Sequence, residues 1–158
     1  QGDDGLWNTA FHEMLRHSTS IGGQPRHNTF DIELHAVTIP SGSLVHMVDV
    51  AANHDDRVFA DPERFDIFRE DLYSGKILRS GHDKDGRYSH MGFGVGPHLC
   101  PGAWISHQEA VIGSQILADN MPNVRINVER MAKDIDGESL APIGLGSIRE
   151  LWLDFDLT

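Results

Sequence analysis

The sequence predicts a mixed α+β fold, and the spacing of its apolar residues supports that prediction. Apolar side chains recur at helical spacing in residues 6–17 and 102–119, which is typical of helices that bury one face. In residues 151–157 they occupy alternate positions, which is the period of a half-buried strand. Glycine and proline interrupt the chain between these segments, so short strands and turns are expected there.

The first helix is expected to end at about His17. Its apolar stripe consists of Leu6, Ala10, Phe11, Met14 and Leu15. Glu13 and Arg16 are three residues apart, which places them on one helix face and close enough to pair. An exposed pair of this kind stabilises a helix by only about 0.2–0.5 kcal/mol. The spacing alone therefore predicts a solvated pair on the surface.

Two strand-like segments follow, at about residues 31–34 and 44–50. Pro40 and Gly42 lie between them and favour a turn. Further along, a one-turn helix is expected near Asp61, within a stretch that is rich in turn-forming residues.

Residues 70–89 contain three glycines and many charges, so a polar loop is expected there. The longest helix is expected at residues 102–119. It should stop at Met121 and Pro122, because proline cannot continue a helix.

The composition excludes several classes of partner. The chain of 158 residues carries 13 basic and 24 acidic residues, a net charge of -11, which argues against nucleic acid or an anionic membrane as a partner. No apolar run reaches the roughly 18 residues of a membrane-spanning helix, and the sequence does not open on a basic and then apolar leader. A single cysteine excludes an internal disulfide and fits a reducing compartment. We therefore expect a cytoplasmic protein.

That cysteine, Cys100, lies in a glycine-rich loop directly before the longest helix. Helix N-termini and the amide groups of glycine-rich turns both favour negative charge, so the position should stabilise a thiolate that can ligate a soft metal. A small buried hydrophobe is the commoner fate of a free cysteine. The glycines favour the first interpretation, because a tightly turning backbone leaves room for a flat ligand.

The spacing of this loop resembles the haem-ligand loop of the cytochrome P-450 superfamily. The matching residues are Phe93, Gly94, Gly96, His98, Cys100 and Gly102. The resemblance implies that the Cys100 thiolate is the axial ligand of a haem b iron, where its electron donation favours cleavage of the O–O bond. It also implies that Phe93 and the glycines pack against the haem and that His98 contacts a haem propionate.

Two further motifs of the same family lie upstream. Glu13 and Arg16 match its Glu-x-x-Arg pair, and residues 61–66 resemble its Pro-x-Arg-Phe meander. The resemblance implies that Arg64 completes a buried structural triad, whose charged hydrogen bonds would fix the loop that presents the cysteine. Arg26 is implied to bind a second haem propionate, since guanidinium groups suit carboxylates.

The family resemblance implies an enzyme that inserts oxygen into a small organic substrate. Electrons would come from a ferredoxin or a similar partner, or peroxide would replace them. His107 stands where the family often has arginine, which removes a positive charge from the expected donor face. We expect residues 1–158 to form a single haem-binding region that matches only the C-terminal part of the family fold, without its N-terminal and distal-helix region. A second chain or a dimer would then cover the distal haem face.

Several alternatives remain at this point. In one alternative, the chain is a standalone haem-binding or peroxide-using protein. In another, it is a non-catalytic fragment or interaction module. A zinc site of His90, His98 and Cys100 would lack the usual fourth ligand. Nucleophilic catalysis by Cys100 with His98 or His107 is chemically feasible, but the neighbouring Pro101 and glycines fit haem packing better.

Overall fold

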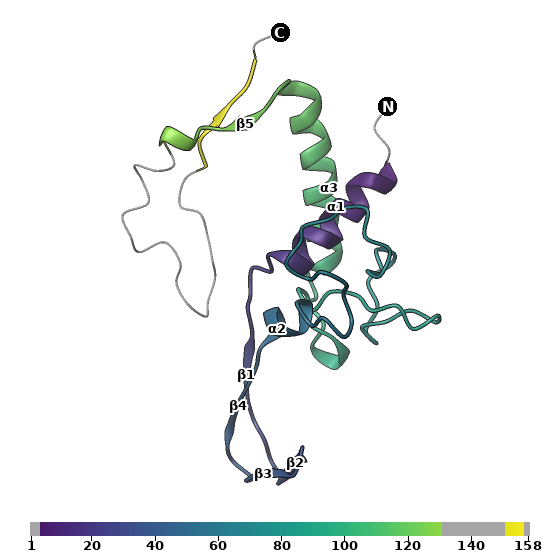
Figure 1. The fold of residues 1–158 in the computed structure, drawn as a ribbon, viewed down its shortest axis with the longest axis vertical. Coiled ribbons are helices and arrows are strands. Elements are labelled where there is room, and N and C mark those ends of the chain that lie inside the picture. Colours follow the sequence, from purple (N-terminus) through teal and green to yellow (C-terminus); the bar gives the residue numbers. More distant parts are fainter. Residues whose placement is uncertain (1–3, 131–150, 157–158) are drawn as a thin grey trace.

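Helices and small antiparallel sheets make up the computed structural model, which describes residues 4–130 and 151–156. This confirms the α+β prediction. Helix α1 (Asp4–His17) packs against helix α3 (Ala103–Asn120), and the short helix α2 (Asp49–Asn53) packs against α1 (Figure 1). Both long helices lie within one or two residues of the predicted ranges.

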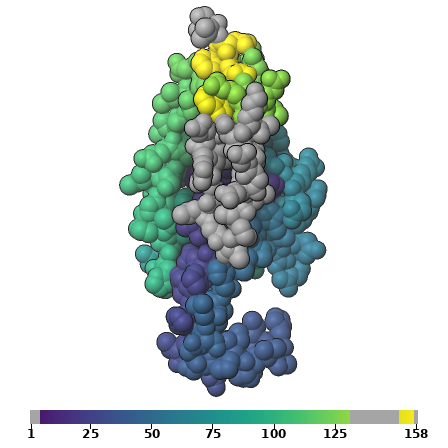
Figure 2. Space-filling model, turned by 90° about the vertical axis from the view of Figure 1, so that its left-hand side faces the viewer, coloured from purple at the N-terminus to yellow at the C-terminus, as the bar shows by residue number. Residues whose placement is uncertain are grey.

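The strands form three separate two-stranded antiparallel sheets. The pairs are β1 (Gln24–His27) with β4 (Leu44–Met47), β2 (Ile32–Leu34) with β3 (Val37–Ile39), and β5 (Arg125–Ile126) with β6 (Leu153–Asp154). The β1–β4 ribbon extends away from the helices as an arm, with the β2–β3 hairpin at its tip (Figures 1 and 2). In the β1–β4 register, Arg26 lies opposite Val45.

The strands that the sequence predicts are present near their expected positions, but the structure contains further strands that were not predicted. Strands β2 and β4 correspond to the expected segments, although β4 is shorter because the chain turns into α2 at Asp49. Strands β1 and β3 were not expected, since β1 has no apolar alternation and β3 is only three residues long. The one-turn helix near Asp61 is wrong: this residue has a φ of 46° within a turn. Of the predicted terminal strand, Leu157 lies outside the described residues.

A small apolar core forms where α1 meets the start of α3 and the segments between them. Its buried members are Phe11, Leu15, Phe59, Leu72 and Ala103. The Arg16 guanidinium lies 5.5 Å from the centroid of the Phe59 ring, so the core continues directly into a buried polar network.

Helix α3 leaves most of its apolar residues exposed, among them Ile105, Ile112, Ile116 and Leu117. A helix that is apolar on most sides is typically covered on more than one face. The described residues cover only the side that faces α1.

Residues 70–89 form the expected polar loop, with turns and a single isolated bridge between His82 and Tyr88. Asp83 organises its tip, accepting hydrogen bonds from the backbone amides of Asp85 and Arg87 at 2.9 and 2.8 Å. In the described part of the chain, no helix has both the length and the apolarity needed to cross a membrane.

The burial of the core predicts that a Leu→Ala substitution lowers the free energy of unfolding by different amounts at two positions. Leu15 is buried on α1, whereas Leu117 on α3 is 55% exposed. We expect Leu15→Ala to lower the free energy of unfolding by about 2–5 kcal/mol, because it leaves a cavity. Leu117→Ala is the matched control and should change it by less than about 0.5 kcal/mol. Urea unfolding of the purified protein measures both, and similar losses in the two variants would contradict this core.

Candidate functional site at the cysteine loop

The loop that presents Cys100 is built from a tight, glycine-dependent turn. Gly94 and Gly96 have φ values of 69° and 72°, a backbone region that glycine enters without steric cost. A 3-10 turn spans Gly96–His98. The amide of Cys100 then donates to the carbonyl of Phe93 at 2.9 Å and closes the loop.

Cys100 is a free, half-buried thiol that precedes the first turn of α3. A Cβ built on Gly102 would lie 3.8 Å from the sulfur, so glycine at this position keeps the space beside the thiol open. Among the described residues, Sγ has no hydrogen-bond partner. The sulfur is therefore free to bind an external ligand.

An open hollow of about 590 Å³ lies beside the cysteine loop. Its lining consists of Ile77, Arg79, Pro97, His98, Leu99, Cys100, Pro101 and Trp104. The 70–89 loop is attached here, because the amide of Gly96 donates to the carbonyl of Arg79 at 2.7 Å. This loop therefore borders the cysteine, a contact that its polar composition did not predict.

Arg26 and His98, the two predicted propionate contacts, are both exposed. Arg26 donates to the Pro25 carbonyl at 2.8 Å and to Oε1 of Gln24 at 2.6 Å, and it forms no salt bridge within the described residues. A Cβ on Gly94 would lie 3.8 Å from Nε2 of Gln24. Strand β1 is thus adjacent to the cysteine loop, and the Arg26 charge also acts on the buried carboxyl of Asp49.

Glu13 and Arg16 are completely buried, so the solvated pair predicted from spacing alone is wrong. Their contact is bidentate: Nε of Arg16 donates to Oε2 at 2.7 Å and Nη2 donates to Oε1 at 2.9 Å. The amide of Asp66 adds a third hydrogen bond to the carboxylate at 2.8 Å. Such paired hydrogen bonds between charged groups are the strong class of polar contact in proteins.

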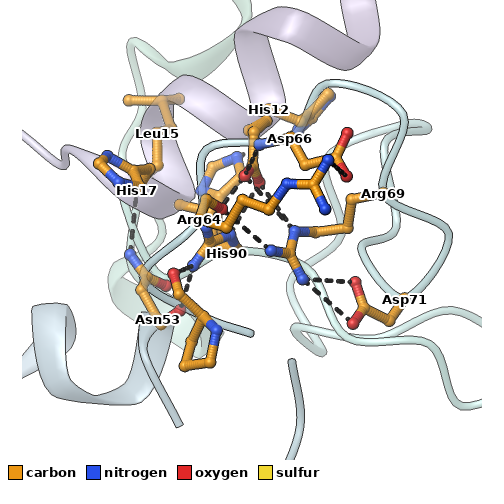
Figure 3. Close-up of polar contacts among 12 residues, drawn as sticks. His12, Leu15, His17, Asn53, Arg64, Asp66, Arg69, Asp71 and His90 are labelled. Carbon is orange, nitrogen blue, oxygen red and sulfur yellow. Dashed lines mark hydrogen bonds and ion pairs between the residues drawn. The ribbon is translucent and has the colours of Figure 1, made fainter. Parts of the chain in front are cut away.

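The third side chain of this network is Arg69, which corrects the prediction of Arg64 (Figure 3). Nε of Arg69 lies 3.3 Å from Oε2 of Glu13. The Arg64 side chain is 67% exposed and lies 3.5 Å from Asp66. A turn in which the Arg64 amide donates to the Asp61 carbonyl directs the side chain outward. Only the backbone carbonyl of Arg64 joins the network, as an acceptor for both buried arginines.

The network keeps Glu13 ionised. Burial by itself would raise the pKa of this carboxyl, but hydrogen bonds from Arg16 and the Asp66 amide, together with the charges of Arg16 and Arg69, lower it overall. The stability that it contributes is therefore present at neutral pH and is lost only as the pH falls through its lowered pKa.

Asn53 connects this network to the cysteine loop, a role that the sequence did not reveal. The side chain is fully buried. Its Oδ1 accepts from the amide of Met91 at 2.7 Å, and its backbone carbonyl accepts from Nη1 of Arg16 at 2.9 Å. The one local feature that could have indicated this role is an amide side chain at the end of a short helix, because such a side chain can form hydrogen bonds with backbone groups of a distant segment.

Two histidines behind the loop were also missed as a pair, since 78 residues separate them. His12 is 1% exposed and His90 is 3% exposed. Burial, followed by the charge of His107, lowers the pKa of His12 to about 4. Burial, followed by the charge of His12, lowers the pKa of His90 to about 3. Both rings are therefore neutral at neutral pH.

Among residues 4–130 and 151–156, no three His, Cys, Asp or Glu side chains are placed to hold a metal ion. The suggested zinc set is not assembled. His90 is buried against His12, whereas His98 is exposed and Cys100 is half-buried.

The correction at Arg69 predicts a clear order of stability effects. Arg69→Ala removes a buried partner of Glu13 and should lower the free energy of unfolding by about 3–5 kcal/mol. Arg64→Ala keeps the backbone carbonyl and removes only an exposed pair, so its cost should stay below about 1 kcal/mol. Chemical unfolding of the two variants measures both values. A larger loss for Arg64→Ala would restore the original assignment.

The buried histidines predict an acid-sensitive stability. An unfolded histidine has a pKa of about 6.5, above the folded values of His12 and His90, so the unfolded chain binds more protons as the pH falls below 6.5. From about pH 7.5 to about pH 5.5, each ring should reduce the free energy of unfolding by roughly 1 kcal/mol. His12→Gln should weaken this pH dependence, and the exposed control His27→Gln should leave it unchanged. Unfolding curves at both pH values decide the matter.

The chain matches known proteins along most of its length. Residues 6–118 match the family model for cytochrome P450. A cytochrome P450 of Mycobacterium tuberculosis (strain ATCC 25618 / H37Rv), designated P450 140, is 32% identical over 149 residues, which cover 92% of this chain and 31% of that protein. The 20-oxo-5-O-mycaminosyltylactone 23-monooxygenase of Streptomyces fradiae is 31% identical over 121 residues, which cover 77% of this chain and 25% of that protein.

Solved structures support the same relationship. The structure of P450BioI in complex with acyl carrier protein ligated to hexadec-9Z-enoic acid matches with a TM-score of 0.75 and 27% sequence identity. That match covers 98% of this chain and 34% of the P450BioI chain. The chain thus spans about a third or less of the length of these three proteins. The extent of the family-model match, with the cysteine loop inside it, shows that the chain belongs to the cytochrome P450 family.

Proposed function

We propose that Cys100 is the axial thiolate ligand of a haem b iron and that the protein containing this chain inserts oxygen into a small organic substrate. The observation that supports this most directly is the free, half-buried Sγ at the end of a glycine-dependent loop, directly before α3. Members of the cytochrome P450 family bind haem, and the Streptomyces fradiae relative is named as a monooxygenase.

The residues present fit a haem. A thiolate is a suitable axial donor for haem iron, and the sulfur has no competing hydrogen bond among the described residues. Glycine at position 102 leaves open the space that a Cβ would occupy next to Sγ. Arg26, without a salt bridge in the described part of the chain, and His98 would bind the two propionates. Under this proposal, these residues would hold the haem on the side of the ring that the loop faces.

The bound haem would supply the oxidising chemistry. This chain's residues would hold and tune it. The glycine-rich loop and the start of α3 would present Sγ to the haem iron. Asn53 and His90 hold two consecutive amides of the loop, those of Met91 and Gly92, so the sulfur has a fixed position relative to α1.

The partners follow from the same proposal. Electrons would come from a ferredoxin-like protein, or peroxide would supply both oxygen and electrons. The apolar residues exposed on α3 and on the β1–β4 arm support a larger protein, or a second chain, that covers the remaining haem face and excludes water from it.

The ligand assignment predicts a spectroscopic signature. The reduced protein with carbon monoxide should show the red-shifted absorption of a thiolate-ligated haem, and Cys100→Ala should abolish it because no other residue of the loop offers a thiolate. Ser114→Ala, on the same helix and far from the loop, is the control and should keep the band. An unchanged band in Cys100→Ala would rule out this sulfur as the ligand.

A further inference from the structure

The hydrogen bonds of two buried imidazoles fix which nitrogen of each ring carries a proton. The amide of Gly92 donates to Nδ1 of His90 at 3.1 Å, so this nitrogen is an acceptor and bears no hydrogen. In a neutral imidazole the proton must then lie on the other nitrogen. Nε2 of His90 therefore donates to Nδ1 of His12, which is 3.1 Å away.

The same reasoning assigns the second ring. Because Nδ1 of His12 accepts a hydrogen bond, its own proton lies on Nε2. That nitrogen is buried and makes no hydrogen bond of normal length among the described residues, and the nearby Gly75 carbonyl favours a proton on this ring. The donors thus run in one direction, from the Gly92 amide through His90 to His12.

The surroundings prevent either ring from becoming charged at neutral pH. Their neighbours within ring-contact distance are Phe11, Phe93 and His107. Glu13, next to His12 on α1, is already bound by the two buried arginines. No carboxylate forms a hydrogen bond or ion pair with either imidazole in the part of the chain that the structure describes. A proton added to the pair would therefore break a hydrogen bond without gaining a counter-ion.

Gly92 is held closely on its other side as well. A Cβ at this position would lie 3.2 Å from Nδ1 of His90, from the Leu15 carbonyl oxygen and from Oγ1 of Thr19. The loop therefore approaches the end of α1 at the distance that glycine allows, and His90 forms one wall of that contact. A shift of the His90 ring would move Gly92 and, with it, Phe93.

We propose that His90, held in a single tautomer by the Gly92 amide and hydrogen-bonded to His12, is a positioning residue for the Cys100 loop. It fixes the Gly92 amide, and the hydrogen bond from the Cys100 amide to the Phe93 carbonyl carries that position to the cysteine. Both nitrogens of His90 are used in this way and the ring is buried, so it takes no part in metal binding or proton transfer. Its effect on haem binding rests on the proposed function of Cys100, whereas the tautomers do not.

The first experiment reads the tautomers by nitrogen NMR of the purified protein with isotope-labelled histidine, in its diamagnetic carbon monoxide form where haem is bound. The expected result is a proton on Nε2 of both His12 and His90 and a bare Nδ1 on each, together with a Gly92 amide protected from exchange. A proton on Nδ1 of His90, or a charged ring at neutral pH, would overturn the assigned tautomers of His90 and His12 whether or not the protein binds haem.

The second experiment separates the two nitrogens of His90 with conservative variants. In His90→Asn, Oδ1 replaces the acceptor for the Gly92 amide, whereas in His90→Gln the side-chain amide replaces only the donor to His12. Loss of a supporting hydrogen bond around a metal ligand typically lowers metal affinity or activity 10- to 100-fold. We therefore expect His90→Gln to raise the rate of haem loss at least about tenfold and His90→Asn to stay within about threefold of the parent.

If His90→Gln and His90→Asn change the rate of haem loss equally, or if neither changes it, the positioning role is overturned. The exposed control His27→Gln should have the parent rate. Where His90→Gln does not fold, His90→Leu, which also lacks an acceptor for the Gly92 amide, is compared with His90→Asn instead; equal rates of haem loss in these two variants would overturn the proposal. If the parent protein shows no thiolate band, that result would instead count against the proposed function and would leave the NMR result unaffected.

Discussion

The buried carboxylate of Glu13 is the strictest constraint in this structure. An ionised group leaves water only where charged and polar donors replace its hydration. The replacements come from its own helix, through Arg16, from the meander, through the Asp66 amide, and from just beyond the meander, through Arg69. Arg16 also binds the carbonyl of Asn53 at the end of α2. The Glu13 carboxylate and its two arginines thus join α1, the end of α2 and the segment that follows the meander.

The cysteine loop is held by this frame at two consecutive amides, one through a charged network and one through a neutral pair. The Met91 amide binds Asn53, whose backbone belongs to the Glu13 network, and the Gly92 amide binds His90, whose partner His12 precedes Glu13 on α1. Two adjacent fixed amides define both the position and the direction of a chain. The glycines that follow can then turn freely without making the position of Cys100 uncertain.

The sequence predicted the parts of this arrangement that depend on local spacing. Glu13 and Arg16 are neighbours on any helix, and the glycines around Cys100 require a tight turn wherever the loop lies. Contacts that depend on how distant segments meet could not be predicted in the same way. Arg64 closes the meander turn and Arg69 follows it, and only the direction of that turn decides which guanidinium reaches Glu13. The His12–His90 contact and the role of Asn53 similarly join positions whose separation gives no periodic signal, and the exposure of α3 depends on what covers it.

The described residues form one side of the proposed haem site and leave the other open, and the physical reasons for the two halves differ. Under the proposed function, the position of Cys100 depends on the two held amides, the start of α3 and the buried Glu13 network, and all of these lie within the described residues. Protecting an oxidising centre requires exclusion of water over a wide apolar surface. The apolar residues that α3 and the arm expose would border such an enclosure, and the two named relatives are about three times as long as this chain, since 92% and 77% of it match 31% and 25% of them. Under the proposed function, the covering protein should therefore pack on these apolar surfaces and leave the Glu13 network, which is already satisfied, unchanged.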